Sequence, residues 1–145
     1  MISKPTIGTM SKGNRTIKIK RAYESPDPAD GYRVLVDRLW PRGMTKSQLS
    51  LDAWDKRLAP SDALRRWFAH DPLRWSEFKT RYQFELRADN ASSALDELAE
   101  KAMTRTITLV YGARDDKHNH AIVLEGELVR RVGATPAASK TRKTR

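Results

Sequence analysis

The segment RVLVDRLWPRG (residues 33–43) decides the fold prediction, because it joins an apolar run to a dense group of polar and turn-forming residues. The run VLV at 34–36 is typical of a strand that is buried on both faces of a sheet. The remainder, DRLWPRG, places an aspartate, two arginines and a tryptophan where that strand should end. We therefore expect a core strand at residues 32–39 that delivers polar side chains to one edge of a sheet.

Two further strands and a series of helices are predicted around this segment. TIKIKRAY (16–23) alternates isoleucine with lysine, as a partly exposed strand does, and TITLVYG (106–112) is a β-branched run that ends in polar residues. Between them, apolar residues recur at helical spacing, and Ser50, Ser61 and Asp71 occupy positions typical of helix N-caps. We expect helices at 50–58, at 61–68, from Pro72 through Leu86, across Leu95 to Ala102, and at 121–129.

Strands that alternate with helices favour a parallel or mixed sheet covered by helices. The predicted fold class is therefore α/β, with a small, mostly parallel or mixed sheet of about three core strands and four to five helices. Residues 16–132 would form this single domain, between disordered basic tails at 1–15 and 133–145.

Composition narrows the functional classes. The chain has 145 residues and no cysteine, which excludes disulfides, thiolate catalysis and cysteine-ligated metal centres. It has no apolar run long enough to span a membrane and no secretory signal pattern, so we expect a cytoplasmic protein without a membrane partner. No cofactor is evident, because no phosphate-binding loop, dinucleotide fingerprint or serine-hydrolase elbow is present.

The net charge of +10 lies mainly at the two ends of the chain. Residues 1–15 and 133–145 carry seven basic residues and no acid, which leaves +3 for residues 16–132. Such tails add weak, salt-sensitive affinity for nucleic acid, or serve only as solubilising ends.

A binding site is expected where the second and third strands end. Ligands of open α/β sheets bind beyond the carboxyl ends of the strands, and the segments DRLWPRG and YGARDDKHNH (111–120) would meet there if the strands are parallel neighbours. The candidate site residues are Asp37, Arg38, Trp40, Arg42, Tyr111, Asp115, Asn119 and His120.

Each of these residue types suggests a role. Arg38 and Arg42 would bind an anion, because guanidinium is a planar fork that matches carboxylate or phosphate. Trp40 and Tyr111 would line the pocket, Asp115 and Asn119 would contact the ligand, and His120 with Asp37 would handle protons as a catalytic pair. The alternative is that the charged residues only fix the turn. A metal site at the adjacent histidines His118 and His120 is not favoured, because side chains two residues apart on a helix point to different sides.

Three strings of the sequence carry a resemblance to a known family. VLVDRLWPRGM, WDKRLAPSDALRRWFAHDPLRWSEFKTRYQFEL and TITLVYGARDDKHNHAIVL resemble the family called domain of unknown function 488, in order and across residues 16–130. The resemblance implies a bacterial or archaeal cytoplasmic protein of a family without an established activity.

Another branch of that family has a cysteine and a glutamate after the last strand and then Cys-His-Arg at the start of the last helix. By resemblance, Tyr111 and Ala113 stand at the first cysteine and the glutamate, while Asn119, His120 and Ala121 stand at Cys-His-Arg. This chain therefore resembles a cysteine-free branch, in which His120 is the chemical group retained.

Three functional classes remain open at this point. The first is a pocket for a small anionic, phosphate-bearing or nucleotide-like ligand, either with or without catalysis. The second is a nucleic-acid-associated module that binds through its basic tails. The third is a non-catalytic interaction domain.

Overall fold

A computed structural model describes residues 16–143, with side chains described for residues 16–133. The fold is α/β, as expected. Four strands are present: β1 (Ile17–Arg21), β2 (Tyr32–Leu35), β3 (Ala53–Trp54) and β4 (Ile107–Tyr111). The helices are α1 (Lys46–Leu49), α2 (Asp62–Phe68), α3 (Trp75–Glu85), α4 (Asp89–Ala102) and α5 (His120–Lys143), with 3₁₀ turns η2 (Pro28–Asp30), η3 (Lys56–Leu58) and η4 (Pro72–Arg74).

The four strands form one parallel sheet in the order β1-β4-β2-β3. Strand β4 is therefore central, and it pairs with β2 in the register Val34 to Leu109. The expectation that these two strands are neighbours is confirmed. Strand β2 is shorter than predicted and ends at Leu35 rather than at residue 39, although the Val36 amide still donates to Val110.

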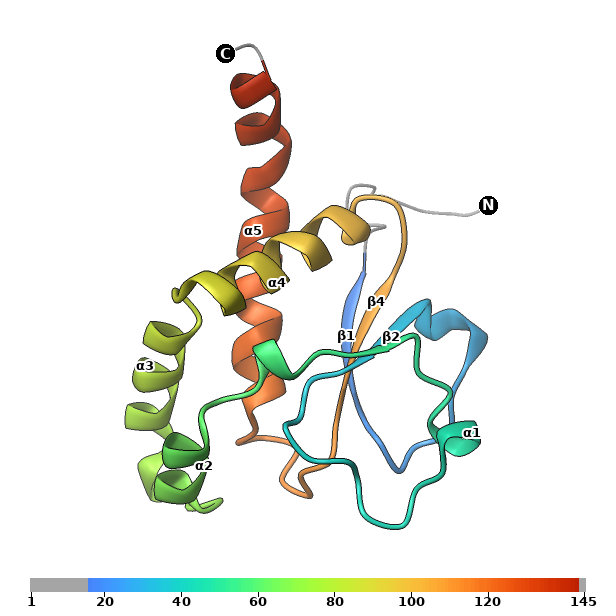
Figure 1. Cartoon of the computed structure of the whole chain (residues 1–145), viewed down its shortest axis with the longest axis vertical. Coiled ribbons are helices and arrows are strands. Elements are labelled where there is room, and N and C mark those ends of the chain that lie inside the picture. Colours follow the sequence, from blue (N-terminus) through green and yellow to red (C-terminus); the bar gives the residue numbers. More distant parts are fainter. Residues whose placement is uncertain (1–15, 144–145) are drawn as a thin grey trace.

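One face of the sheet is covered by α2 to α5, which Figure 1 shows gathered on one side of the strands. Val34 and Val36 of the second strand segment and Ile107, Leu109 and Tyr111 of β4 point to this face, because successive side chains of a strand alternate. They pack against apolar residues of the helices, which include Phe78, Tyr82, Leu95 and Leu124. The predicted stripes of α3 and α4 are thus confirmed as core.

The opposite face of the sheet is covered by η2 and α1 and contains a buried ion cluster. Asp30 is fully buried, and its carboxylate pairs with Lys18, Lys20 and Arg33 at 2.7 to 3.1 Å. The backbone carbonyl of Asp30 also accepts from the Thr108 hydroxyl of β4. This cluster fixes the start of β2 against the sheet.

Gly31 connects η2 to β2 at a point where the chain passes close to its neighbour. Its φ is +65°, and a Cβ atom added there would lie 2.4 Å from the Thr106 carbonyl oxygen. Only glycine satisfies both conditions, because it has no Cβ and tolerates positive φ.

The helix predicted at 50–58 is wrong. Ser50 lies after α1 in a left-handed conformation (φ 49°), so it ends that helix instead of starting another. Residues 53 and 54 pair with β2 as strand β3. Within residues 50–58, only η3 (Lys56–Leu58) is helical. Pairing with a sheet edge outweighs the local helical spacing of LDAWDKRL.

The other helix starts agree with the prediction. Ser61 accepts from the Leu64 amide at the start of α2, and Asp71 accepts from Leu73 at the start of η4. At the end of the chain, α5 passes through the expected domain boundary at residue 133 and reaches Lys143. The tail predicted at 1–15 lies outside the described residues. None of the described helices has the length and apolar character needed to cross a membrane.

Candidate functional site

A cavity of about 670 Å³ lies beyond the carboxyl ends of β2 and β4, beside the first residue of α5. The loops that follow these two strands reach the same end of the sheet (Figure 1). The cavity is bordered by residues of both loops, of α2 and of α3. Its lining residues are Tyr23, Asp37, Arg38, Leu39, Trp40, Pro41, Arg42, Pro60, Arg65, Phe68, His70, Phe78, Gly112, Ala113, Arg114, Asp115, His118, Asn119 and His120.

Asp37 links the two strand ends from inside this cavity. Its Oδ2 atom accepts a hydrogen bond of 2.9 Å from the backbone amide of Gly112, 75 residues later in the chain. A Cβ atom at position 112 would lie 3.0 Å from that oxygen, so glycine allows the close approach. The Asp37 carbonyl also accepts from the Trp54 indole at 2.7 Å, which holds the end of β3.

His120 lies against Asp37 at the start of α5. Its Nε2 atom is 3.0 Å from the Val36 carbonyl oxygen and 3.2 Å from Asp37 Oδ1. Both partners are acceptors, so Nε2 carries the proton and Nδ1 is the nitrogen with a lone pair in the neutral ring. The hydrogen bond goes to Val36, and Asp37 Oδ1 is buried without a hydrogen-bond partner among the described residues.

A second histidine–carboxylate pair lies in the loop before α5. His118 Nδ1 is 2.9 Å from Asp115 Oδ2, and Asp115 Oδ1 accepts from the amides of Lys117 and His118. Hydrogen bonds from the Lys117 amide and the His118 ring lower the pKa of Asp115, so it is an anion at neutral pH. The His118 ring meets Trp75 edge to face, with 5.4 Å between ring centroids.

Four arginines line the cavity, and they differ in how they are paired. Arg38 donates to the Pro60 carbonyl and lies 3.6 Å from Asp62, and Arg65 donates to Asp62 at 3.2 Å while its Nε is buried without an acceptor among the described residues. Arg42 and Arg114 are exposed, and their guanidinium groups contact no acid in the described part of the chain. The four arginines outnumber the two lining carboxylates, Asp37 and Asp115, so the lining residues carry more positive than negative charge.

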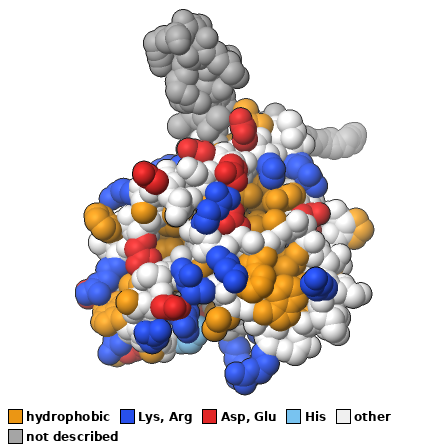
Figure 2. Space-filling view, in the orientation of Figure 1, with side chains coloured by type: hydrophobic (Ala, Val, Ile, Leu, Met, Phe, Trp, Pro, Cys, Tyr) orange, Lys and Arg blue, Asp and Glu red, His pale blue; other side chains and the backbone are white. Residues whose placement is uncertain are grey.

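The remaining walls are apolar. Trp40 donates its indole hydrogen to the Met44 carbonyl and meets Trp54 edge to face at 5.4 Å. Phe68 and Phe78, which stack on each other at 4.3 Å, border the cavity from the helices. The Trp54 ring is also covered by Lys56 at 4.4 Å. Figure 2 shows apolar surface edged by lysine and arginine side chains on the face viewed there.

The structure brings together seven of the eight residues predicted for this site, and Tyr111 is the exception. Tyr111 is buried in the core under the helices and does not line the cavity, because strand alternation turns it to the same face as Ile107 and Leu109. Asn119 reaches the cavity, but its side chain accepts from the Ile122 amide and donates to the Asp115 carbonyl. Asn119 therefore caps α5.

Sequence reasoning missed two arginines, Arg65 and Arg114. Arg114 lies in the segment already assigned to the site, and its position directly after the strand end was a usable signal. Arg65 is contributed by α2, and nothing local predicted that this helix would reach the strand ends. All three histidines of the chain, His70 included, line the same cavity.

The lining contains proton donors, proton acceptors and cations, but it has no arrangement suited to a metal ion. Among residues 16–133, no group of three or more histidine, aspartate or glutamate side chains is placed to hold one. The chemistry available to the described residues is anion binding by arginine and proton exchange at His120.

Comparison with known proteins places the chain in a family. A family model described as the inactive DUF488-N3 subclade matches residues 16–143. The chain belongs to this family. The domain of unknown function 488 resemblance is thus confirmed, over more of the chain than the three strings covered.

Curated relatives of this DUF488-N3 chain carry the name uncharacterized protein. The uncharacterized protein YeaO of Escherichia coli (strain K12) is 42% identical over 108 residues, which cover 74% of this chain and 92% of that protein. The uncharacterized protein Rv3073c of Mycobacterium tuberculosis (strain ATCC 25618 / H37Rv) is 44% identical over 108 residues, covering 74% of this chain and 89% of the relative. No solved structure matches the chain.

Proposed function

We propose that the cavity at the ends of β2 and β4 binds a small anionic ligand that carries a phosphate or carboxylate group. The observation that carries this proposal is the pair Arg42 and Arg114. Both arginines line the cavity and neither pairs with an acid among the described residues, while Asp37 and Asp115 each lie within 3.2 Å of a histidine. An anion at this point would supply the missing counter-charge.

The shape and burial of the site support a ligand larger than a bare ion. A cavity of about 670 Å³ is within the range typical of sites for small organic molecules. Trp40, Phe68 and Phe78 add apolar residues to the lining. These features favour a ligand with an anionic group and a flat, partly apolar body, such as a nucleotide.

The family description favours a cavity that binds its ligand without catalysing a reaction. The matching subclade is described as inactive, and the chain has no cysteine with which to perform thiol chemistry. Proton transfer by His120 is the second candidate, because its Nε2 is held by Val36 and Asp37 and leaves Nδ1 as the basic nitrogen.

Thermal unfolding of the full chain against a panel of compounds tests the proposal. The panel contains nucleoside monophosphates and diphosphates, sugar phosphates, pyrophosphate and short oligonucleotides. A ligand at 100 times its dissociation constant adds about 2.7 kcal/mol to the free energy of unfolding, which raises the melting temperature by several degrees. The double substitution Arg42→Ala with Arg114→Ala should abolish the rise.

Lys117→Ala is the matched control, since Lys117 is an exposed cation of the same loop that does not line the cavity. An equal shift in the double variant and the wild type would contradict the proposal. A salt-sensitive shift with oligonucleotides alone, unaffected by the arginine substitutions, would favour the nucleic-acid class instead.

A further inference from the structure

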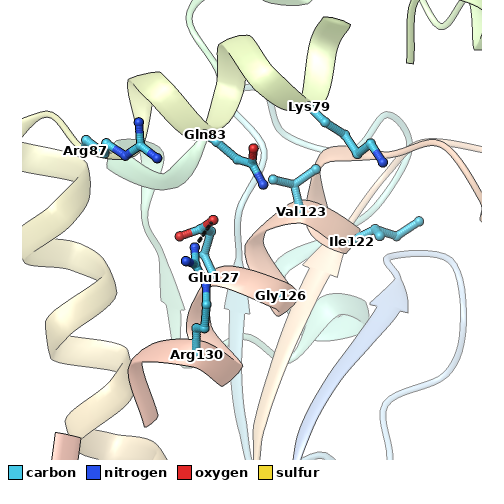
Figure 3. Close-up of a pocket in the computed structure, with 8 residues that line it drawn as sticks. All are labelled: Lys79, Gln83, Arg87, Ile122, Val123, Gly126, Glu127 and Arg130. Carbon is cyan, nitrogen blue, oxygen red and sulfur yellow. Dashed lines mark ion pairs between the residues drawn. The ribbon is translucent and has the colours of Figure 1, made fainter. Parts of the chain in front are cut away.

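A groove of about 380 Å³ lies between α3 and α5, away from the cavity at the strand ends. Figure 3 shows Lys79 and Gln83 of α3 and Arg87 of the turn after it on one side, and the α5 residues Gly126, Glu127 and Arg130 on the other. Ile122 and Val123 complete its lining. No residue of this groove lines the cavity of the proposed function, so the two are separate features.

Both helices supply residues at four-residue spacing. Lys79 and Gln83 occur at i and i+4 on α3, and Arg87 follows four residues later in the turn after α3. Ile122, Gly126 and Arg130 have the same spacing on α5. Two facing helical ridges of this kind form the seat for a third helix.

Gly126 makes the hollow in the centre of the groove. It lies inside α5, where glycine is less favourable than alanine. A Cβ atom built at this position meets no atom within 4 Å, so neither close packing nor positive φ within the described chain requires glycine there. The missing side chain leaves room for an apolar side chain from a partner.

Exposed apolar side chains flank the groove on both helices. Phe84 is 73% exposed and lies three residues before Arg87, while Val129 is 53% exposed and lies three residues after Gly126. Val129 is a surface neighbour of Gly126 on α5, since residues three apart on a helix are close, and Phe84 directly follows the lining residue Gln83 on α3. Exposed large apolar residues grouped beside a groove are typical of a protein contact surface.

The charges of the lining decide what kind of partner fits. Glu127, 13% exposed, pairs with Arg130 at 2.5 Å, as the dashed line in Figure 3 indicates. Lys79 on α3 and Arg87 in the turn after it form no ion pair with other residues in the described range. Residues 1–15 of the chain itself carry three basic residues and no acid, so they do not complement this surface.

We propose that the groove between α3 and α5 binds an acidic amphipathic helix of a partner protein. An apolar side chain of that helix fills the hollow at Gly126, and acidic side chains at its two ends pair with Lys79 and Arg87. Phe84 and Val129 extend the apolar contact along the outer sides of the groove.

The test uses the full chain and a fluorescein-labelled synthetic peptide of about 16 residues, long enough to form a helix on binding. Leucines at i, i+4 and i+7 form its apolar stripe, and glutamates flank them. Fluorescence anisotropy should show saturable binding of this peptide. A peptide with glutamine in place of every glutamate should bind at least tenfold more weakly.

Two variants locate the binding. Gly126→Leu fills the hollow and should abolish binding, while its melting temperature stays at or above that of the wild type because α5 loses a glycine. Lys79→Glu with Arg87→Glu should lower the affinity at least tenfold without changing the groove's shape. Lys46→Glu is the control, since Lys46 lies on α1 at the opposite face of the sheet, and its affinity should equal that of the wild type.

Absence of saturable binding, or equal affinity of the wild type and both groove variants, would overturn the proposal. Equal affinity for the glutamate and glutamine peptides would overturn it as well. Sedimentation of the chain alone gives a further check. Self-association that Gly126→Leu abolishes would assign the groove to a second copy of the chain and would also contradict the proposed partner.

Discussion

The Gly112 amide donates to Asp37 Oδ2 over 2.9 Å and thereby joins the ends of β2 and β4. The same carboxylate lies 3.2 Å from His120 at the start of α5, so one side chain contacts three segments of the chain. Asp37, which follows β2, therefore has a structural role even without a ligand. Asp37, Gly112 and His120 also line the cavity of the proposed function.

Asp37→Ala should destabilise the fold by about 1 to 3 kcal/mol, because it leaves the Gly112 amide without its acceptor in a partly buried site. Asp37→Asn retains an acceptor oxygen and should cost less. Chemical denaturation of the three proteins measures the difference. Asp116→Ala, which removes an exposed acid of the neighbouring loop, should leave the free energy of unfolding nearly unchanged. If the free energy of unfolding of Asp37→Ala equals that of the wild type, the Asp37–Gly112 junction contributes nothing to stability.

Gly31→Ala should lower the free energy of unfolding by more than about 2 kcal/mol. The substitution combines positive φ with a Cβ atom 2.4 Å from the Thr106 carbonyl oxygen. Gly43→Ala is its matched control. Gly43 also has positive φ (+80°), but a Cβ there meets nothing within 4 Å, so only the conformational cost of about 1 kcal/mol is expected. Equal losses in both variants, measured by denaturant unfolding, would contradict the role assigned to the close approach.

Asp30 should make the fold sensitive to acid. Burial alone would raise the pKa of this carboxyl, but hydrogen bonds from Lys20, Lys18 and Arg33 hold the pKa well below its usual range. The unfolded state, with an ordinary aspartate pKa near about 3.9, therefore binds a proton before the folded state does. The stabilising contribution is complete above about pH 5 and is lost as the pH falls below 4.

Asp30→Asn separates this effect from that of the other carboxylates. The variant should be less stable at pH 7, by about 3 to 5 kcal/mol, because three cations lose their buried counter-charge. Its free energy of unfolding should then fall less steeply than that of the wild type between pH 5 and 3. If the free energy of unfolding depends on pH in the same way in the wild type and in Asp30→Asn, Asp30 is not a source of the acid sensitivity.

Much of the fold was predictable because its central elements have strong local patterns. The β-branched run at 106–112 and the apolar run at 34–36 each indicated a strand, and Ser61 and Asp71 marked helical starts that the structure confirms. The segment after Ser50 was mispredicted because its two-residue strand exists only through pairing with β2. Such a contact between distant segments leaves no local signal.

The residues of the candidate site likewise divide into those that the sequence could predict and those that depend on tertiary packing. The sheet rule placed Asp37, Arg42 and His120 at one edge, and the structure puts them on one cavity. Tyr111 was misplaced because the last residue of β4 obeys the alternation of the strand and turns into the core. Arg65 could not be predicted, because the position of α2 depends on how α2 and α3 pack over the sheet.

A titration of isotope-labelled full chain with adenosine monophosphate, followed by amide resonances, tests the central claim most directly. We predict saturable shifts confined to the cavity, at Gly112, Arg114 and His120, and their loss in the Arg42→Ala, Arg114→Ala double variant. Resonances on α4, none of whose residues line the cavity, should not move. Unchanged cavity resonances at millimolar ligand, or equal shifts in the double variant, would contradict the proposal that this cavity binds a nucleotide-like anion.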